Sequence, residues 1–563
     1  MKKSIKKFSI YIFFIAMTLY NASCTKNFDE INTDPSIVTN PDINALFAYS
    51  LENLESYQGT EWVWESLEQL LRFSQHVTTD PYELSTNINS RYRVYYNNIL
   101  PNLAEIRKQV DAREDKDRYR NVRATTYIVQ VLHGLKVSDM NGSIPYTEAI
   151  KGRTDALYTP LYDGQQKLYD TWLTELDGSI EALSAASTGQ VNFSSADFFY
   201  NSDWTSWAKL ANTLKLRIAV RYERQDADVT KRIFREVMEN AIGPIDNDIS
   251  QFVYDKPQHN PIGADIDYRS PRFGTSSIIN FLKSTNDPRL KIYFSPNDLA
   301  GAFKDTLAKY GKTLPAFINI NDPMIQWQGG PADWTTDLAT ATWYKTAFDA
   351  GGNNRYRLLG TINKKFFAPR HLATYNGKML DYMVTWAETC FYIAEFIQKG
   401  YGAGFDTKGT AEEWYNKGIA ASVRTMNDIA IAAESTVGYT GNGDAEIAAY
   451  QQHANVKFNG VNDLERIYIQ QYLNFFRLGN EAFTFVRRTG YPANNSTYYK
   501  RNAWVEPIPR RYWLDEPPLG TNNANWLKSQ QEQGFTPGDR SIPALSTQRL
   551  WFDKNSPDFG QGN

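Results

Sequence analysis

Apolar side chains recur at helical spacing in several long segments, and this periodicity constrains the fold more than any other feature of the chain. Residues at i, i+3, i+4 and i+7 lie on one face of a helix, so each stripe marks a face that packs against a core. The clearest stripes consist of Tyr169, Trp172, Leu173, Leu176, Ile180 and Leu183, of Trp207, Leu210, Ala211, Leu214 and Ile218, and of Met383, Ala387, Cys390, Phe391, Ala394 and Ile397. Strand-like alternation is confined to short pieces such as 250–254. The pattern predicts a mainly α protein with few short strands.

Residues with known preferences at helix ends delimit several of these helices. Asn40 followed by Pro41 predicts an N-cap and a first helical position, because proline lacks the N–H that would be orphaned there. Asp163 is the expected N-cap of the helix over 163–183, and Gly400 is the expected C-cap of the helix that contains Cys390. The sequence GYGAG follows a helix instead of a strand, so we interpret it as a helix-ending loop and not as a phosphate-binding loop.

Two stretches, from about residue 245 to 375 and from 490 to the end, are rich in turn-forming residues. They contain DKPQHNPIG, QWQGGPADW, DAGGNN and DEPPLG. Long ordered loops on a helical body are frequent places for binding sites. These stretches therefore either carry a binding site or simply cover the core.

The amino-terminal residues are typical of an exported protein. Lysines precede the apolar run Phe8–Tyr20, and the small residues Ala22 and Ser23 stand directly before Cys24. This order predicts a signal peptide over residues 1–23. A cysteine at the first mature position predicts acylation of its thiol, which makes Cys24 the expected lipid anchor. The polar segment 24–40 is then a flexible tether, while an ordinary secretory peptide is the alternative.

Charge and cysteine content exclude several classes of protein. The formal net charge is −3, which gives no electrostatic case for binding nucleic acid. The chain has two cysteines, so lipidation of Cys24 leaves Cys390 alone and excludes a disulfide framework. Cys390 lies on an apolar stripe and is expected to be a small core residue.

Familiar catalytic patterns do not occur in the sequence. We find no HExxH pair, no GxSxG elbow, no Walker loop and no metal-spaced cluster of cysteine and histidine. The chain has only scattered histidines, namely His76, His133, His259, His371 and His453. No catalytic residue, metal or cofactor is therefore expected, although a pair of carboxylates suited to glycoside hydrolysis has no sequence signature.

Several segments, taken in order along the chain, resemble those of one known family. The chain reads CTKNFDEINTDP from Cys24 and later SDMNGSIPYTEAI, in which Ser143 stands where relatives commonly have an acidic residue. PLYDGQQKLYDTWLTELD and DWTSWAKLANTLKLRIAVRY follow, and the most specific stretch is IQQYLNFFRLGNEAFTFVRRTGYP. In these motifs the chain resembles the SusD/RagB family of outer-membrane nutrient-binding lipoproteins, and within it the SusD-like subgroup described as starch-binding-associated.

This resemblance implies both a fold and a role. The fold is a SusD-like domain over residues 41–563, in which tetratricopeptide-type helix pairs form a scaffold for a loop-rich portion with few short strands. The role is to capture an oligosaccharide, or in some relatives a peptide, as the lid of a SusC-like TonB-dependent β-barrel transporter in the outer membrane. A lipid-anchored glycoside hydrolase and a structural or adhesive surface protein are the alternatives.

The shared motifs are chiefly architectural, so ligand contacts are sought among aromatic residues in loops. Aromatic residues make up 14% of the chain, which suits a packed core but also stacking against sugar rings or peptide side chains. The candidate ligand-binding residues are Trp62, Trp64, Tyr82, Trp327, Gln328, Asp333 and Trp334. Trp327 and Trp334 flank Gly329–Gly330, where absent side chains permit close approach of a ligand. The alternative is that the tryptophans fill seams between helices and loops, and Arg487 and Arg488 are expected to anchor helix ends and carboxylates such as Glu481.

Overall fold

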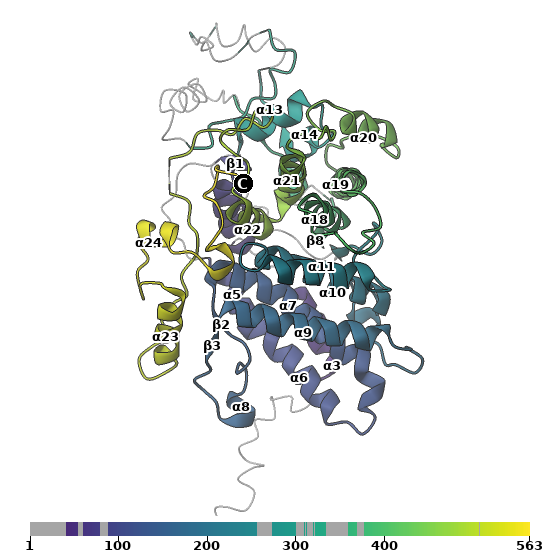
Figure 1. Ribbon diagram of the computed structural model, residues 1–563, viewed down its shortest axis with the longest axis vertical. Helices are drawn as coiled ribbons and strands as arrows, with labels where there is room; N and C mark the ends of the chain where they lie inside the picture. Colours follow the sequence, from purple (N-terminus) through teal and green to yellow (C-terminus); the bar gives the residue numbers. More distant parts are fainter. Residues whose placement is uncertain are drawn as a thin grey trace, which may run out of the picture.

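The molecule consists of a lower and an upper layer of helices, and its carboxy-terminal segment runs along one side of both (Figure 1). The computed structural model describes residues 41–54, 60–78, 88–255, 273–299, 309, 311, 319, 321–333, 358–368, 376–505 and 507–562. Residues 1–40 lie outside this set, and so do Tyr82 and Trp334. The expected signal peptide, the Cys24 anchor and the 24–40 tether are therefore beyond the described residues.

The lower layer is built from successive helices that pack against one another along the chain. Its main helices are α3 (Ile43–Glu52), α5 (Ser90–Val94), α6 (Leu100–Asp111), α7 (Arg120–Asn141), α9 (Gln165–Ser184), α10 (Trp204–Tyr222) and α11 (Ala227–Glu239). The segments between them contain the π-helix η1 (Thr60–Leu70) and shorter helical pieces: α4 (Leu71–Phe73), η2 (Tyr95–Ile99), η3 (Lys116–Tyr119), α8 (Gly152–Asp155) and η4 (Ser194–Ala196). Every residue of the predicted stripes on α9 and α10 is buried, so these two amphipathic helices are confirmed.

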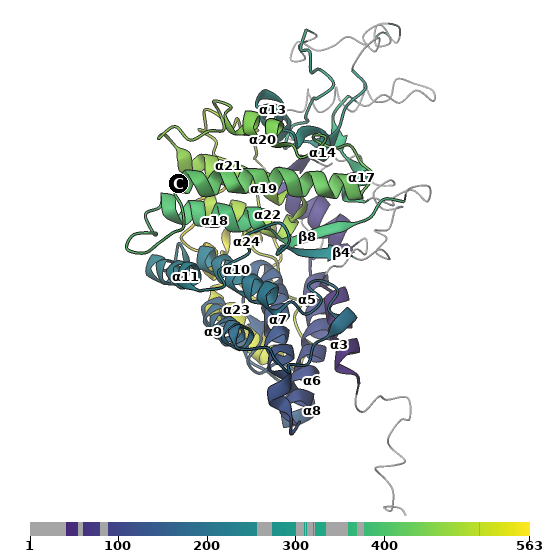
Figure 2. The same ribbon diagram turned by 90° about the vertical axis from the view of Figure 1, so that its right-hand side faces the viewer.

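The upper layer contains the remaining long helices, and Figure 2 shows α18 and α19 lying above α10 and α11. Its helices are α13 (Ser276–Ser284), α14 (Leu290–Tyr293), α17 (Lys364–Phe367), α18 (Trp386–Gln398), α19 (Ala411–Ala432), α20 (Asp444–Gln451), α21 (Asp463–Asn474), η5 (Phe475–Arg477) and α22 (Gly479–Thr489). The carboxy-terminal segment adds α23 (Asn523–Gln533), α24 (Ile542–Thr547) and η6 (Trp551–Asp553). Cys390 is a fully buried residue of α18, as expected. The mainly α fold class is confirmed.

The strands are few and short, as predicted. They are β1 (Val77–Thr78), β2 (Ile144–Pro145), β3 (Tyr162–Asp163), β4 (Phe252–Asp255), β5 (Phe273–Gly274), β6 (Phe294–Ser295), β7 (Thr361–Ile362) and β8 (Leu380–Val384). They pair antiparallel into one sheet of order β1-β5-β7-β6 and two hairpin-sized sheets, β2-β3 and β4-β8. The piece predicted near 250–254 corresponds to β4. Met383, expected on the helical stripe of α18, belongs instead to β8, the strand that pairs with β4.

Two of the predicted helix caps are wrong. The first helix begins at Ile43 and not at Pro41, because Asp42 is the N-cap and accepts a hydrogen bond from the Asn44 N–H at 3.0 Å. Asp163 does not cap α9, since its carboxylate accepts the backbone N–H groups of Tyr146 and Thr147 at 3.2 and 2.7 Å. Gly164 takes the N-cap position without any side-chain hydrogen bond.

The predicted end of α18 is confirmed within one residue. Lys399 is the C-cap, and Gly400 follows it at φ 77°, a left-handed conformation that glycine adopts without strain. The GYGAG sequence accordingly forms turns after a helix. Among the described residues, no helix is both long enough and apolar enough to cross a bilayer.

Buried ion pairs link the layers. Arg217 of α10 binds Glu388 of α18, with Nε–Oε1 and Nη2–Oε2 distances of 2.5 and 2.8 Å. Arg221, one turn further along α10, binds Asp139 of α7 at 2.8 Å and Glu481 of α22 at 2.7 Å. Charges removed from water are tolerated only when they are paired and hydrogen-bonded. These contacts therefore fix the register between the two layers.

Arg487 and Arg488 have the structural role that the sequence predicts. Arg487 donates to the carbonyl oxygens of Asp139 and Arg510 at 2.7 and 2.9 Å. Arg488 binds both carboxylate oxygens of Glu395 on α18, at 2.5 and 2.8 Å. The ion-pair partner of Arg488 is therefore Glu395, while Glu481 is held by Arg221.

A half-buried carboxyl on α9, that of Glu175, makes stability depend on pH near neutrality. Burial raises the pKa of Glu175 to about 7, although a hydrogen bond from the Tyr146 hydroxyl opposes the shift. A raised pKa means that the folded state binds the proton more tightly than the unfolded state. The stabilisation that comes from the protonated Glu175 is therefore present at low pH and lost as pH rises through about 7.

Glu175→Gln should therefore have a higher Tm than the wild type at pH 8 and nearly the same Tm at pH 5. Thermal unfolding at both pH values tests this, with Glu181→Gln on the exposed face of α9 as the matched control; equal Tm differences at the two pH values would contradict it.

Candidate functional site

The first pair of candidate tryptophans lies on a helix instead of the expected loop. Trp62 and Trp64 belong to η1, a helix of the wide π type, and residues two apart on a helix point in different directions. Trp62 is 6% exposed and contacts the rings of Phe367 and the guanidinium of Arg477. Trp64 is half-buried. The two rings therefore do not form the side-by-side platform that a loop would allow.

The second group lies where the chain between β6 and β7 crosses α13. Trp327 is 9% exposed and packs in the core, and Gln328 is half-buried. Asp333 is buried and accepts a hydrogen bond from the Val505 N–H at 2.9 Å. A side chain at Gly329 would meet the Ser276 backbone at 2.5 Å, so the glycine permits close packing of this chain segment on α13. Ligand contact by the candidate residues stays a prediction, with Trp64 and Gln328 the more accessible of those described.

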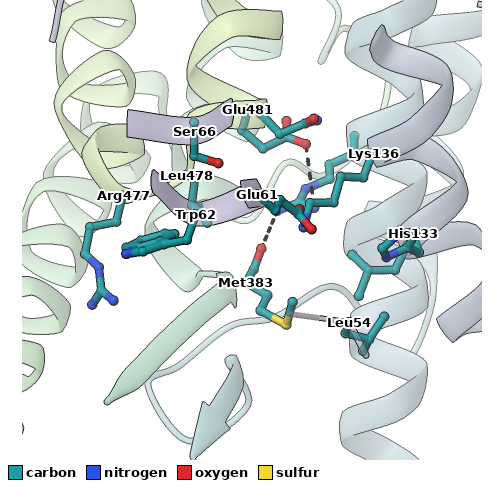
Figure 3. A pocket seen from close by; sticks show the side chains of 14 residues that line it. Leu54, Glu61, Trp62, Ser66, His133, Lys136, Met383, Arg477, Leu478 and Glu481 are labelled. Carbon is teal, nitrogen blue, oxygen red and sulfur yellow. Dashed lines mark hydrogen bonds and ion pairs between the residues drawn. The ribbon is translucent and has the colours of Figure 1, made fainter. Parts of the chain in front are cut away.

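Trp62 borders a partly open cavity between η1, α7, α10, η5 and α22, with a volume of about 70 Å³ (Figure 3). Its wall combines apolar surface, from residues such as Leu54, Trp62 and Met383, with several charged side chains. The charged or titratable residues that line it are Glu61, His133, Lys136, Arg217, Arg477 and Glu481. Sequence reasoning did not identify these residues as a group, because they occupy ordinary helix positions and meet only through the packing of five elements.

The charges around this cavity are balanced within the protein. Burial by itself raises the pKa of Glu61, but the Lys136 ammonium that pairs with it and the nearby Arg91 outweigh burial, so the pKa is lowered. Burial, followed by the Lys136 charge, lowers the pKa of His133 to about 3. Glu61 is therefore ionised and His133 neutral at pH 7. Neither is suited to proton transfer near neutrality, where a catalytic pKa should lie close to the working pH.

The size of the cavity decides what it can hold. Sites for small organic ligands have volumes of roughly 300–1,000 Å³. The volume of the cavity lies well below that range, so we interpret it as a packing gap between the layers and not as the place where a ligand is captured.

The comparisons with known proteins agree with this fold. The sequence model of a family described as starch-binding associating with outer membrane matches residues 32–513. No curated protein matches the chain. The chain is similar in structure to a chitin-binding protein, with 21% identity, a TM-score of 0.67, and coverage of 91% of this chain and 100% of the other.

Two further solved structures are similar over the same extent. A chitin-binding SusD homolog from Flavobacterium johnsoniae is 20% identical with a TM-score of 0.63, and the match covers 92% of this chain and 100% of the other. A SusD homolog from Bacteroides fragilis is 16% identical with a TM-score of 0.63, and the match covers 91% and 99%. At these identities the structures establish the fold, and they confirm the resemblance found in the sequence.

Proposed function

Because the chain belongs to the SusD-like family of starch-binding proteins that associate with the outer membrane, we propose that it captures an oligosaccharide, or alternatively a peptide, at the cell surface. In this proposal it acts as the lid of a SusC-like TonB-dependent barrel that imports the cargo. The observation that carries the proposal is the family match over residues 32–513. Similarity to solved SusD homologs over nine-tenths of the chain supports it.

Binding without catalysis is the second part of the proposal. Two of the similar structures are named as chitin-binding proteins, and neither name describes an enzyme. The chemistry of the described residues agrees with this role. Burial raises the pKa of the Cys390 thiol and lowers the pKa of His76 to about 3, so neither side chain is an activated nucleophile or base near neutral pH.

The attachment to the membrane is the third part. We assign residues 1–23 to a signal peptide, Cys24 to the lipid anchor, residues 24–40 to a tether and residues 41–563 to the nutrient-binding domain. Several acyl chains hold a protein firmly, since each buried CH₂ contributes about 0.8 kcal/mol. A short tether also keeps the lid near its barrel at an effective concentration in roughly the millimolar range.

Replacing the anchor cysteine should separate the protein from the membrane without unfolding it. Cys24→Ser removes the thiol that carries the lipid, and Cys390→Ser is the matched control, because that thiol is buried in α18. We expect the Cys24→Ser protein in the aqueous phase after detergent phase separation and the Cys390→Ser protein in the detergent phase. Equal partition of the Cys24→Ser variant and the wild type would overturn the assignment of the anchor.

The importer role is tested by affinity purification from detergent-solubilised outer membrane, with the tag at the carboxy terminus. We expect a TonB-dependent barrel to co-purify, together with oligosaccharides or peptides identified by mass spectrometry. Recovery of the protein with no more barrel than an unrelated tagged lipoprotein brings would refute the lid proposal and favour a surface glycoside hydrolase or an adhesive protein. The bound small molecules also decide between a glycan and a peptide.

A further inference from the structure

A second hollow of the molecule has the size of a ligand site and lies far along the chain from the candidate tryptophans. It is an open groove of about 390 Å³ between the first turn of α9, the end of α23 and η6. Its volume falls within the range of roughly 300–1,000 Å³ that is usual for small-ligand sites. The groove is therefore large enough for a ligand that the cavity beside Trp62 cannot hold.

One wall of the groove is an aromatic ring held in a fixed orientation. Trp551 is half-buried, and its ring meets those of Tyr169 and Tyr222 edge-on, with centroid distances of 5.9 and 5.1 Å. Both tyrosines are fully buried, at 0% and 1% exposure. A ring that is already ordered loses little conformational entropy when a ligand packs on it. Trp551 thus offers a rigid apolar surface in the wall of the groove.

The other walls supply hydrogen-bonding groups that the protein leaves available. The Gln166 side chain is exposed and makes no hydrogen bond within the described part of the chain. Asp170 accepts one hydrogen bond, from the Tyr222 hydroxyl at 2.5 Å, through only one of its two oxygens. Gln533 is by contrast fixed, since it accepts from the Ser143 N–H at 2.9 Å and donates to the Ser529 carbonyl at 3.0 Å. The groove therefore combines a fixed side chain, Gln533, with hydrogen-bonding groups of Gln166 and Asp170 that are available to a ligand.

The charge of the groove indicates which ligand it suits. Its charged side chains are Lys167, Lys554, Asp170 and Glu532, two of each sign. A balanced rim gives no attraction for a polyanion or a polycation. A pyranose ring presents C–H groups on one face and hydroxyls at its edge, which matches an indole beside amide and carboxylate groups.

We propose that the groove formed by Gly164, Gln166, Asp170, Gln533, Trp551 and Lys554 is a second binding site, for a segment of a neutral oligosaccharide. This inference rests on the proposed glycan-binding function and adds a site away from the loops. A long glycan chain engaged at two places on one protein gains affinity, because the second contact is intramolecular. The groove then helps to retain a polymer while its free end is presented to the importer.

Glycine at the start of α9 allows the groove to be blocked without straining the fold. Gly164 has φ −66° and ψ 155°, a conformation open to any residue, and a Cβ there would meet nothing within 4 Å. Gly164→Trp therefore places a large side chain at the groove. Gly178 of the same helix also has open space around its Cβ and does not line the groove. Gly178→Trp is the matched control for the effects of a new surface tryptophan.

The test is calorimetric titration with maltohexaose and with chitohexaose. The wild type and each variant are purified as the soluble chain from residue 25 onward. We expect the wild type and Gly178→Trp to bind at least one of these alike, and Gly164→Trp to bind it about tenfold more weakly or with fewer sites. Gln166→Ala, which removes a single exposed amide, should weaken binding by about two- to tenfold. This second variant keeps the test valid if Gly164→Trp fails to fold.

The outcomes separate this inference from the proposed function. If the wild type binds an oligosaccharide and all three variants bind it equally, the groove is not a site and the glycan-binding function stands. If the wild type binds neither oligosaccharide, the groove proposal is overturned. The barrel co-purification described above then shows independently whether the importer role survives.

Discussion

Arg221→Met should destabilise the protein by about 3–5 kcal/mol at pH 7, the cost usually seen when one partner of a buried ion pair is removed. Arg221 is 1% exposed and binds Asp139 at 2.8 Å and Glu481 at 2.7 Å. Burial raises the pKa of Asp139 even with Arg221 in place, because desolvation outweighs the guanidinium charge. Without Arg221 the two carboxylates must stay buried next to each other or take up a proton. The measurement is urea unfolding followed by far-ultraviolet circular dichroism.

The control for this prediction is an arginine in an exposed ion pair. Arg232 on α11 binds Glu236 at 2.8 Å, and its side chain is 54% exposed. Exposed pairs of this kind contribute at most about 0.5 kcal/mol, so Arg232→Met should unfold at nearly the wild-type urea concentration. The prediction fails if Arg221→Met and Arg232→Met have the same unfolding midpoint. That outcome would mean that the link between α7, α10 and α22 depends on apolar packing alone.

The helices that were predicted correctly are those whose packing follows from their own sequence. α9 and α10 carry unbroken apolar stripes. One face of each helix must therefore be buried in a core, whichever element packs against it. Cys390 was placed correctly in the core for the same reason. The family resemblance, and not periodicity, supplied the arrangement of these helices into a SusD-like fold.

The features that sequence reasoning missed depend on partners distant in the chain. Asp163 has the right residue type for an N-cap, but it bonds to the loop at 146–147, which the β2-β3 pairing brings beside it. Trp62 was expected on a loop, yet η1 packs it against Phe367. The groove joins Gly164 to Trp551, which are separated by most of the chain. Local sequence patterns do not reveal such long-range contacts.

Acid should weaken the fold through a carboxylate that is strongly held at neutral pH. Burial alone would raise the pKa of Glu395, but Arg488, then Lys399 and a hydrogen bond from Tyr468, lower it from 4.5 to about 2. A depressed pKa means that the stabilisation is present above about pH 4.5 and is lost as pH falls toward about 2. A shift of this size corresponds to about 3 kcal/mol at pH 7. The wild type should therefore lose this contribution progressively between pH 5 and pH 2.

Glu395→Gln isolates this contribution, because glutamine keeps the shape of the side chain and has no charge to lose. The free energy of unfolding of the variant should lie at least about 3 kcal/mol below that of the wild type at pH 7. The pH-dependent part of this difference should fall to less than about half at pH 3, since the unfolded wild type then takes up the proton. Glu412→Gln is the control: this side chain is exposed on the first turn of α19, so the stability curve of the variant should follow that of the wild type. The opposite outcome is a difference in the free energy of unfolding between the wild type and Glu395→Gln that stays constant from pH 7 to pH 3. It would show that Glu395 acts by shape and hydrogen bonding, and that its charge pair with Arg488 contributes nothing to acid sensitivity.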